Sequence, residues 1–175
     1  MSSSSDERRR KKRITRLPRS AQGHRTCSSE NARMISPHIT RAQIALTHAG
    51  ARAILEAAEA KAREIGVDEV IALVDPSGAL VAFSRMDGGR IGSTDIAITK
   101  AVSAATRRRA TADEAGGDVL MGIRLTLISK THVTNIKGGL PIVVDGQTIG
   151  GIGVSSGTPE EDLLVAEAGL AVLNA

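Results

Sequence analysis

The chain has 175 residues and a formal net charge of +4; 41% of its residues are hydrophobic and 1% are aromatic. This length suits one domain with a sizeable core, and the near absence of aromatic side chains argues against a nucleic-acid partner that is bound by base stacking. Cys27 is the single cysteine, so no intrachain disulfide can form. No apolar run reaches the ~20 residues that cross a bilayer. We therefore expect a cytoplasmic protein with no membrane partner.

The positive charge is confined to the N-terminal segment. Residues 1–33 contain ten Lys or Arg and three Asp or Glu, whereas the remaining residues contain 13 basic and 16 acidic side chains. Such a run can contact a polyanion, but its Ser-rich composition without apolar periodicity favours a solvated extension. We expect a disordered basic tail over residues 1–38 and one folded domain over residues 39–175. A translation start at Met34, which would remove most of the tail, is a second hypothesis.

The first predicted element is a helix that begins after Thr47 and ends at Gly66. Alanines recur at spacings of three and four between Ala49 and Ala60, which is the period of a helix face. The Thr47 hydroxyl can cap the first turn, and Gly66 can adopt the left-handed conformation that ends a helix.

A hairpin is predicted to follow this helix. Residues 70–74 form a continuous apolar run rich in β-branched side chains, which predicts a buried strand. The Asp-Pro-Ser-Gly sequence of residues 75–78 is typical of a type I turn. Residues 80–86 then return as the antiparallel partner strand.

A second helix is predicted to begin at Ser93 or Thr94, either of which can cap it, with Asp95 in its first turn. The arginines of residues 107–109 indicate its end, because cations are favoured at the negative end of the helix dipole. One face carries mostly small side chains that permit close approach to a sheet: Ile96, Ala97, Lys100, Ala101, Ala104 and Ala105.

A weaker helix over residues 111–123 and an edge strand within residues 124–137 are expected next. Residues 140–144 and 148–155 are predicted to pair as a second hairpin, because the Asp-Gly of residues 145–146 is a strong two-residue turn signal. Three glycines in the return strand weaken it unless another part of the chain or a ligand approaches its backbone.

The last predicted element is a helix that starts after Thr158. Thr158, Pro159 and Glu161 have the spacing of a capping box with proline in the first turn. Because tight turns connect the strands, we expect an antiparallel sheet of about five strands with helices on both faces, which is an α+β fold.

A set of short motifs, spread over residues 45–175, resembles one protein family. These motifs are Ala57-Glu59-Lys61-Ala62-Gly66, Ala72-Val74-Asp75-Gly78, Arg85-Met86-Asp87-Gly88, Ser93-Asp95-Ala97-Lys100-Ala101, Gly138-Gly139-Pro141 and Gly150-Gly153-Val154-Ser155-Gly157-Thr158-Pro159-Asp162. Together they resemble the GlcG/HbpS haem-binding family, which includes the C-terminal domain of some corrinoid adenosyltransferases. The resemblance implies a profilin-like fold and a homo-oligomer, from dimer to octamer. It also implies haem as a possible cofactor, or otherwise none.

Asp95 and Lys100 match one of these motifs and are candidate site residues. Lys100 can supply a cation for a carboxylate or a haem propionate, while Asp95 orients it or acts as a base. The alternative is that Asp95 stabilises the helix N-terminus and Lys100 covers an interface with its stem.

Arg85 and the glycines Gly138 and Gly139 are candidate ligand-binding residues. Arg85 can clamp a carboxylate, although a surface pair with Asp87 is the alternative. Gly138 and Gly139 would let an anion approach backbone N–H groups, or they form a bulge or a turn.

Two histidines are candidate ligands of haem iron. His132 can ligate the iron or act as a general base near neutral pH, and His48 in the first turn of the first helix is the other candidate. For His132, a partly exposed loop histidine without such a role is the alternative.

Three functions stay open at this point. The first is a haem- or iron-binding accessory protein. The second is a cofactor-free isomerase, hydratase, lyase or deaminase that acts on a small carboxylate, with Asp95, Lys100 and His132 as its catalytic residues. The third is a structural homo-oligomer without catalysis.

Overall fold

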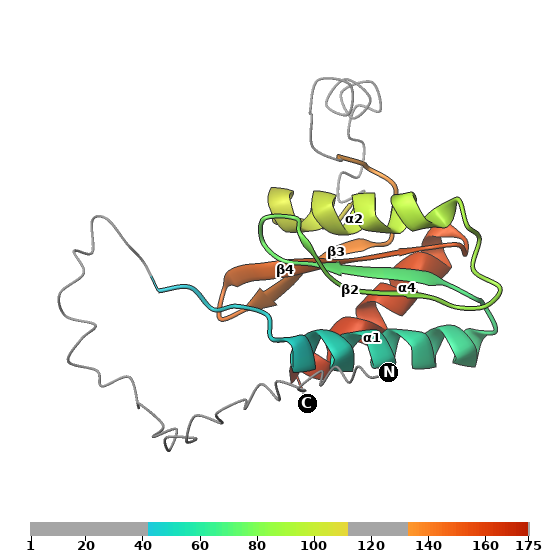
Figure 1. Ribbon diagram of the computed structural model, residues 1–175, viewed down its shortest axis with the longest axis horizontal. Helices are drawn as coiled ribbons and strands as arrows, with labels where there is room; N and C mark the ends of the chain where they lie inside the picture. The colour runs from blue at the N-terminus through green and yellow to red at the C-terminus, as the bar shows by residue number, and fades with distance from the viewer. Residues whose placement is uncertain (1–41, 112–132, 175) are drawn as a thin grey trace, which may run out of the picture. The chain divides into compact units, whose positions relative to one another are not determined.

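The computed structural model describes residues 42–111 and 133–174, all of which lie within one compact unit, Ala42–Ala175. The elements in chain order are α1 (His48–Ile65), β1 (Val70–Val74), β2 (Leu80–Arg85), α2 (Ser93–Arg107), β3 (Gly139–Val144), β4 (Gln147–Ser155), α4 (Pro159–Leu170) and the 3₁₀ helix η2 (Ala171–Asn174). Helix α2 covers one face of the sheet, and α1 and α4 cover the other (Figure 1). The predicted α+β fold with helices on both faces is confirmed. None of the helices in these ranges is long and apolar enough to span a membrane.

The sheet has the strand order β2-β1-β4-β3, and every neighbouring pair is antiparallel. Strand β1 is central and buried at all five positions, as its continuous apolar run predicted. The described part of the chain contributes four strands rather than about five. Residues 133–137 of the expected edge strand are irregular, and the rest of that segment, like most of the expected third helix, lies outside the described residues.

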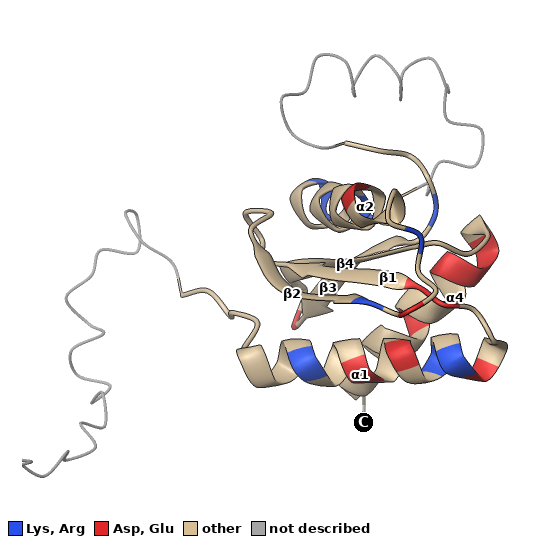
Figure 2. Ribbon diagram, turned by 45° about the vertical axis from the view of Figure 1, so that its right-hand side comes forward, with Lys and Arg blue, Asp and Glu red and all other residues tan. Residues whose placement is uncertain are grey.

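Helix α1 begins and ends where the sequence predicted. Thr47 is its N-cap and accepts a hydrogen bond from the Gly50 N–H at 3.0 Å. Gly66 ends the helix in the left-handed conformation, at φ 73°. Basic and acidic residues recur along α1 (Figure 2) and form three ion pairs within the helix: Arg52–Glu56, Lys61–Glu64 and Arg63–Glu59.

Helix α2 starts differently from the prediction. Gly92 occupies the N-cap position without a side-chain bond, and Ser93 is a buried residue of the first turn. The expectation that Ser93 or Thr94 caps the helix is therefore wrong. The reason is local, since the loop before α2 satisfies the two N–H groups: Ser93 donates to the Arg90 carbonyl and Thr94 to the Ile91 carbonyl. The predicted end is confirmed at Arg107.

The glycines of β4 explain how closely α2 packs on the sheet. A Cβ atom at Gly151 would overlap the Ala101 carbonyl of α2, and one at Gly153 would overlap the Ala97 carbonyl. The helix backbone therefore rests directly on the strand backbone. The glycines of this strand are therefore required because another part of the chain, helix α2, approaches the strand backbone, which was one of the two expected reasons.

The β3–β4 hairpin and the start of α4 also follow the prediction. Asp145 and Gly146 both have positive φ angles, 49° and 73°, as in a type I′ turn. Thr158 and Glu161 form a complete capping box, with Pro159 as the first residue of α4.

The two faces of the sheet carry different cores. The α2 face is lined by small side chains, among them Ala97, Ala101 and Ala105, packed on Val70, Ala72 and Val74. The α1/α4 face is filled by larger aliphatic side chains. The close approach of α2 at one face brings its polar residue Lys100 to the end of the sheet where α4 begins.

Candidate functional site

The predicted partners Asp95 and Lys100 lie in different surroundings. Asp95 is exposed in the first turn of α2, whereas Lys100 is 1% exposed. The Lys100 ammonium donates to Asp162 Oδ2 at 2.6 Å and to the Val154 carbonyl at 2.7 Å. The structure therefore pairs Lys100 with α4 and the end of β4 rather than with Asp95.

Arg85 does not join Lys100 either. It is exposed at the end of β2 and donates to the Gly89 carbonyl at 3.3 Å. Gly138 lies beside Lys100, because a Cβ atom there would be 3.0 Å from the Lys100 ammonium nitrogen. The neighbouring Gly139 donates its N–H to Thr111 Oγ1 at 2.9 Å, so this group is already bonded.

The structure describes one of the two candidate iron ligands. His132 lies outside the described residues. His48 is exposed as the first residue of α1 and is the one histidine within residues 42–111 and 133–174. Within these ranges no group of three or more His, Cys, Asp or Glu side chains could hold a metal ion.

A buried ionic cluster forms where β1, α2 and α4 meet. It consists of Glu69, Lys100 and Asp162, which are 0%, 1% and 3% exposed. Both carboxylates accept a hydrogen bond from one backbone group, the Gly157 N–H, at 3.2 Å for Glu69 Oε2 and 3.0 Å for Asp162 Oδ1. Three segments that are distant in the sequence are thereby joined at one point.

Burial and the nearby Asp162 carboxylate raise the pKa of Glu69 to about 7. The Gly157 N–H and the Lys100 ammonium act in the opposite direction but do not outweigh them. A carboxyl group with such a pKa can gain or lose a proton near neutral pH. The cluster is too enclosed to admit a substrate in this conformation.

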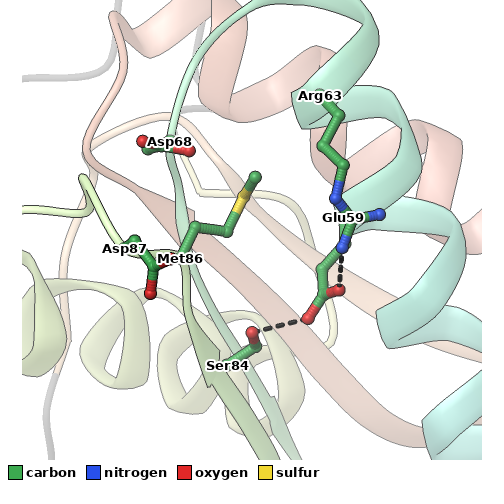
Figure 3. Close-up of a pocket in the computed structure, with 6 residues that line it drawn as sticks. All are labelled: Glu59, Arg63, Asp68, Ser84, Met86 and Asp87. Atoms are coloured by element: carbon green, nitrogen blue, oxygen red, sulfur yellow. Dashed lines mark hydrogen bonds and ion pairs between the residues drawn. The ribbon is translucent and has the colours of Figure 1, made fainter.

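An open pocket lies between α1 and the end of β2 (Figure 3). Its volume is about 430 Å³, and it is lined by Glu59, Arg63, Asp68, Ser84, Met86 and Asp87. The Glu59 carboxylate accepts from Ser84 Oγ at 2.6 Å and from the Arg63 guanidinium at 2.6 Å. With three carboxylates and one guanidinium, the pocket suits a cationic or hydrogen-donating ligand better than an anion.

Sequence reasoning missed most residues of both places. Glu69 directly precedes the apolar strand β1, and an acidic residue at the entrance of a buried strand was the available signal. Glu59 and Arg63 are four residues apart on one helix face, which is a spacing typical of surface ion pairs. Asp162 belongs to a recognised motif, but nothing in the sequence indicates that its partner is Lys100.

Comparison with known proteins gives a consistent result. The family model described as "Haem degrading protein HbpS-like" matches residues 46–171. An uncharacterized 15.0 kDa protein from the dhaT-dhaS intergenic region of Citrobacter freundii is 39% identical over 129 residues, which cover 71% of this chain and 89% of that protein. Protein GlcG of Escherichia coli strain K12 is 35% identical over 115 residues, covering 66% of this chain and 84% of GlcG.

A solved structure agrees with these sequence matches. The PduOC:Heme complex superimposes with a TM-score of 0.67 at 29% identity, over 75% of this chain and 96% of that one. The predicted family resemblance is thereby confirmed. This chain belongs to the HbpS-like family.

Proposed function

We propose that this protein binds haem and acts as a haem- or iron-binding accessory protein. The observation that carries the proposal is the likeness to the PduOC chain, which was solved as a haem complex. The HbpS-like family model, whose description names haem degradation, supports it over residues 46–171.

The open pocket does not fit haem. Its carboxylates from Glu59, Asp68 and Asp87 would repel the propionate groups of the porphyrin. We therefore propose that haem binds elsewhere on the protein.

The start of α1 offers residues that fit the group. The His48 imidazole is exposed and would supply an axial nitrogen ligand. Arg52 lies four residues further along the same helix face, and its guanidinium forms an exposed ion pair with Glu56 at 2.7 Å. Such a surface pair is weak, so a haem propionate can compete for Arg52. Bound haem would supply an iron centre, and His48 and Arg52 would hold the group.

A haemin titration of the full-length protein tests this proposal. We expect a shifted, saturable Soret band at micromolar protein. His48→Ala should lose affinity by about tenfold or more, because even the loss of a residue that supports a metal ligand costs about 10–100-fold. Arg63→Ala, a change on the same helix at the open pocket, is the matched control and should bind haemin like the parent protein. A wild-type protein without a Soret change rejects haem binding.

The same titration separates the two candidate axial ligands. If His48→Ala binds normally and His132→Ala does not, haem binding stands and the ligand is His132. If both variants bind normally, neither histidine is the ligand.

The other two functions stay predictions. A cofactor-free enzyme would need a Lys100 that can reach its substrate, whereas this ammonium is buried and bonded to Asp162. The arrangement favours a structural role for Lys100. The mass of the protein in solution tests the prediction of a homo-oligomer, with or without haem.

A further inference from the structure

In the buried cluster, one carboxylate oxygen has no hydrogen-bond donor. Glu69 Oε1 is buried without a hydrogen-bond partner in the described part of the chain. The Lys100 ammonium bonds to Asp162, and the Gly157 N–H is divided between the two carboxylates. Two ionised carboxylates would thus be left with one cation in a place that water does not reach, which is unfavourable.

The loop above this cluster is held in an uncommon conformation. Ser156 has a φ angle of 131°, which non-glycine residues rarely adopt. Arg90 fixes the loop from the other side, since its guanidinium donates to the Ser156 carbonyl and its N–H donates to Ser156 Oγ at 3.1 Å. Gly157 packs directly on the unpartnered oxygen, because a Cβ atom there would lie 2.5 Å from Glu69 Oε1.

We propose that Glu69 retains a proton beside Asp162 and thereby forms a pH-sensitive latch, which holds residues 156–158, between β4 and α4, against the first turn of α4 while the proton is present. Loss of the proton places a second negative charge beside Asp162. An ionised Glu69 accepts from the Gly157 N–H more strongly, but two repelling carboxylates do not both remain on this one N–H. The contact between the loop and Asp162, in the first turn of α4, is therefore weakened. The latch is independent of haem.

The charged groups around Glu69 favour its protonated form. Lys100 on α2 is the cation that faces the pair, and Asp162 on α4 is the anion. Glu161 on α4 is engaged in the capping box, Arg90 binds loop carbonyls, and Asp68 accepts from the Gly88 N–H. One cation therefore faces two carboxyl groups.

The sign of the pH effect follows from the pKa of Glu69, which burial and Asp162 raise from 4.5 to about 7. Between these values the folded protein keeps a proton that the unfolded chain has lost. The stabilisation is complete below pH 4.5, declines as the pH rises towards 7, and is absent above it. The folding equilibrium constant should fall by up to about 300-fold across this window.

The first test is the urea midpoint of the full-length protein between pH 5 and pH 8. We expect the wild-type midpoint to fall with rising pH, and Glu69→Gln, which resembles the protonated acid, to show a flatter profile and a higher midpoint at pH 8. Glu167→Gln removes a negative charge from an exposed position of α4, the helix that carries Asp162, so it should keep the wild-type slope. An unchanged slope in Glu69→Gln overturns the latch.

The second test needs no variant and applies even if Glu69→Gln does not fold. Carboxyl ¹³C NMR of the wild-type protein should show one glutamate that titrates near pH 7. Hydrogen exchange at the Asp162 N–H, which donates to the Thr158 carbonyl in the first turn of α4, should become faster above pH 7 after correction for its intrinsic pH dependence. A Glu69 that titrates near pH 4.5, or an unchanged protection of the Asp162 N–H, contradicts the proposal.

Discussion

Two ionic clusters of this protein use similar side chains in opposite surroundings. At the β4–α4 junction, Lys100 and Asp162 are paired at 2.6 Å with side chains only 1% and 5% exposed. At the open pocket, Arg63 and Glu59 are paired at the same distance, but their side chains are 61% and 21% exposed. The distances alone would suggest equal bonds. The two pairs differ in their contribution to stability, because water can replace a lost partner at the exposed pocket but not in the buried cluster.

The difference also separates two roles. The buried pair joins α2 to α4 across the end of β4, so it fixes how three elements meet. The pocket pair lies within α1, and the hydrogen bond of Glu59 to Ser84 joins it to β2, so it connects two elements at the surface. The first cluster therefore connects three elements in the interior, whereas the second lies at an open pocket.

Removing one cation from each cluster should produce the largest contrast. Lys100→Met keeps most of the stem but leaves Asp162 buried beside Glu69 without its cation, which should cost about 3–5 kcal/mol of unfolding free energy. Arg63→Met, the matched change at the pocket, should cost at most about 1 kcal/mol. Urea denaturation at pH 7 measures both values. Equal losses would show that burial does not distinguish the two pairs.

Loss of the α4 cap should have an intermediate effect. Thr158 Oγ1 accepts from the Glu161 N–H at 3.3 Å, next to the buried cluster but exposed to solvent. Thr158→Ala should lower the unfolding free energy by about 1 kcal/mol, and Thr158→Ser, which keeps the hydroxyl, should recover most of it. If the alanine variant loses as much as Lys100→Met, the cap and the buried pair act as one unit.

The sequence predicted the features that depend on residues close together in the chain, such as helix caps and turns. Thr158 with Glu161, and the turn of residues 145–146, carry their signals within two to four positions, and the structure confirms them. The missed cap of α2 shows the limit, because the loop before Gly92 satisfies the N–H groups that a side chain was expected to satisfy.

The site was predicted less well, because it is made of distant residues. Lys100 and Asp162 are 62 positions apart, and Glu69 reaches Gly157 across 88. No spacing rule connects such residues. The sequence therefore identified Lys100 as important but assigned Asp95, its neighbour on the same helix, as its partner.

The smallest effect is expected at the pocket. Ser84 Oγ donates to Glu59 Oε1 at 2.6 Å, but water can take its place in the open pocket, so Ser84→Ala should cost no more than about 0.5 kcal/mol. The matched control is Ser103→Ala on α2. Ser103 is 1% exposed, and its hydroxyl donates to the Thr134 carbonyl and accepts from the Thr134 N–H. Loss of this hydroxyl should cost about 1 kcal/mol or more. Urea denaturation of the two variants would refute the distinction between open and buried sites if Ser84→Ala proved the more destabilised, because solvent would then fail to replace a hydrogen bond where it has access.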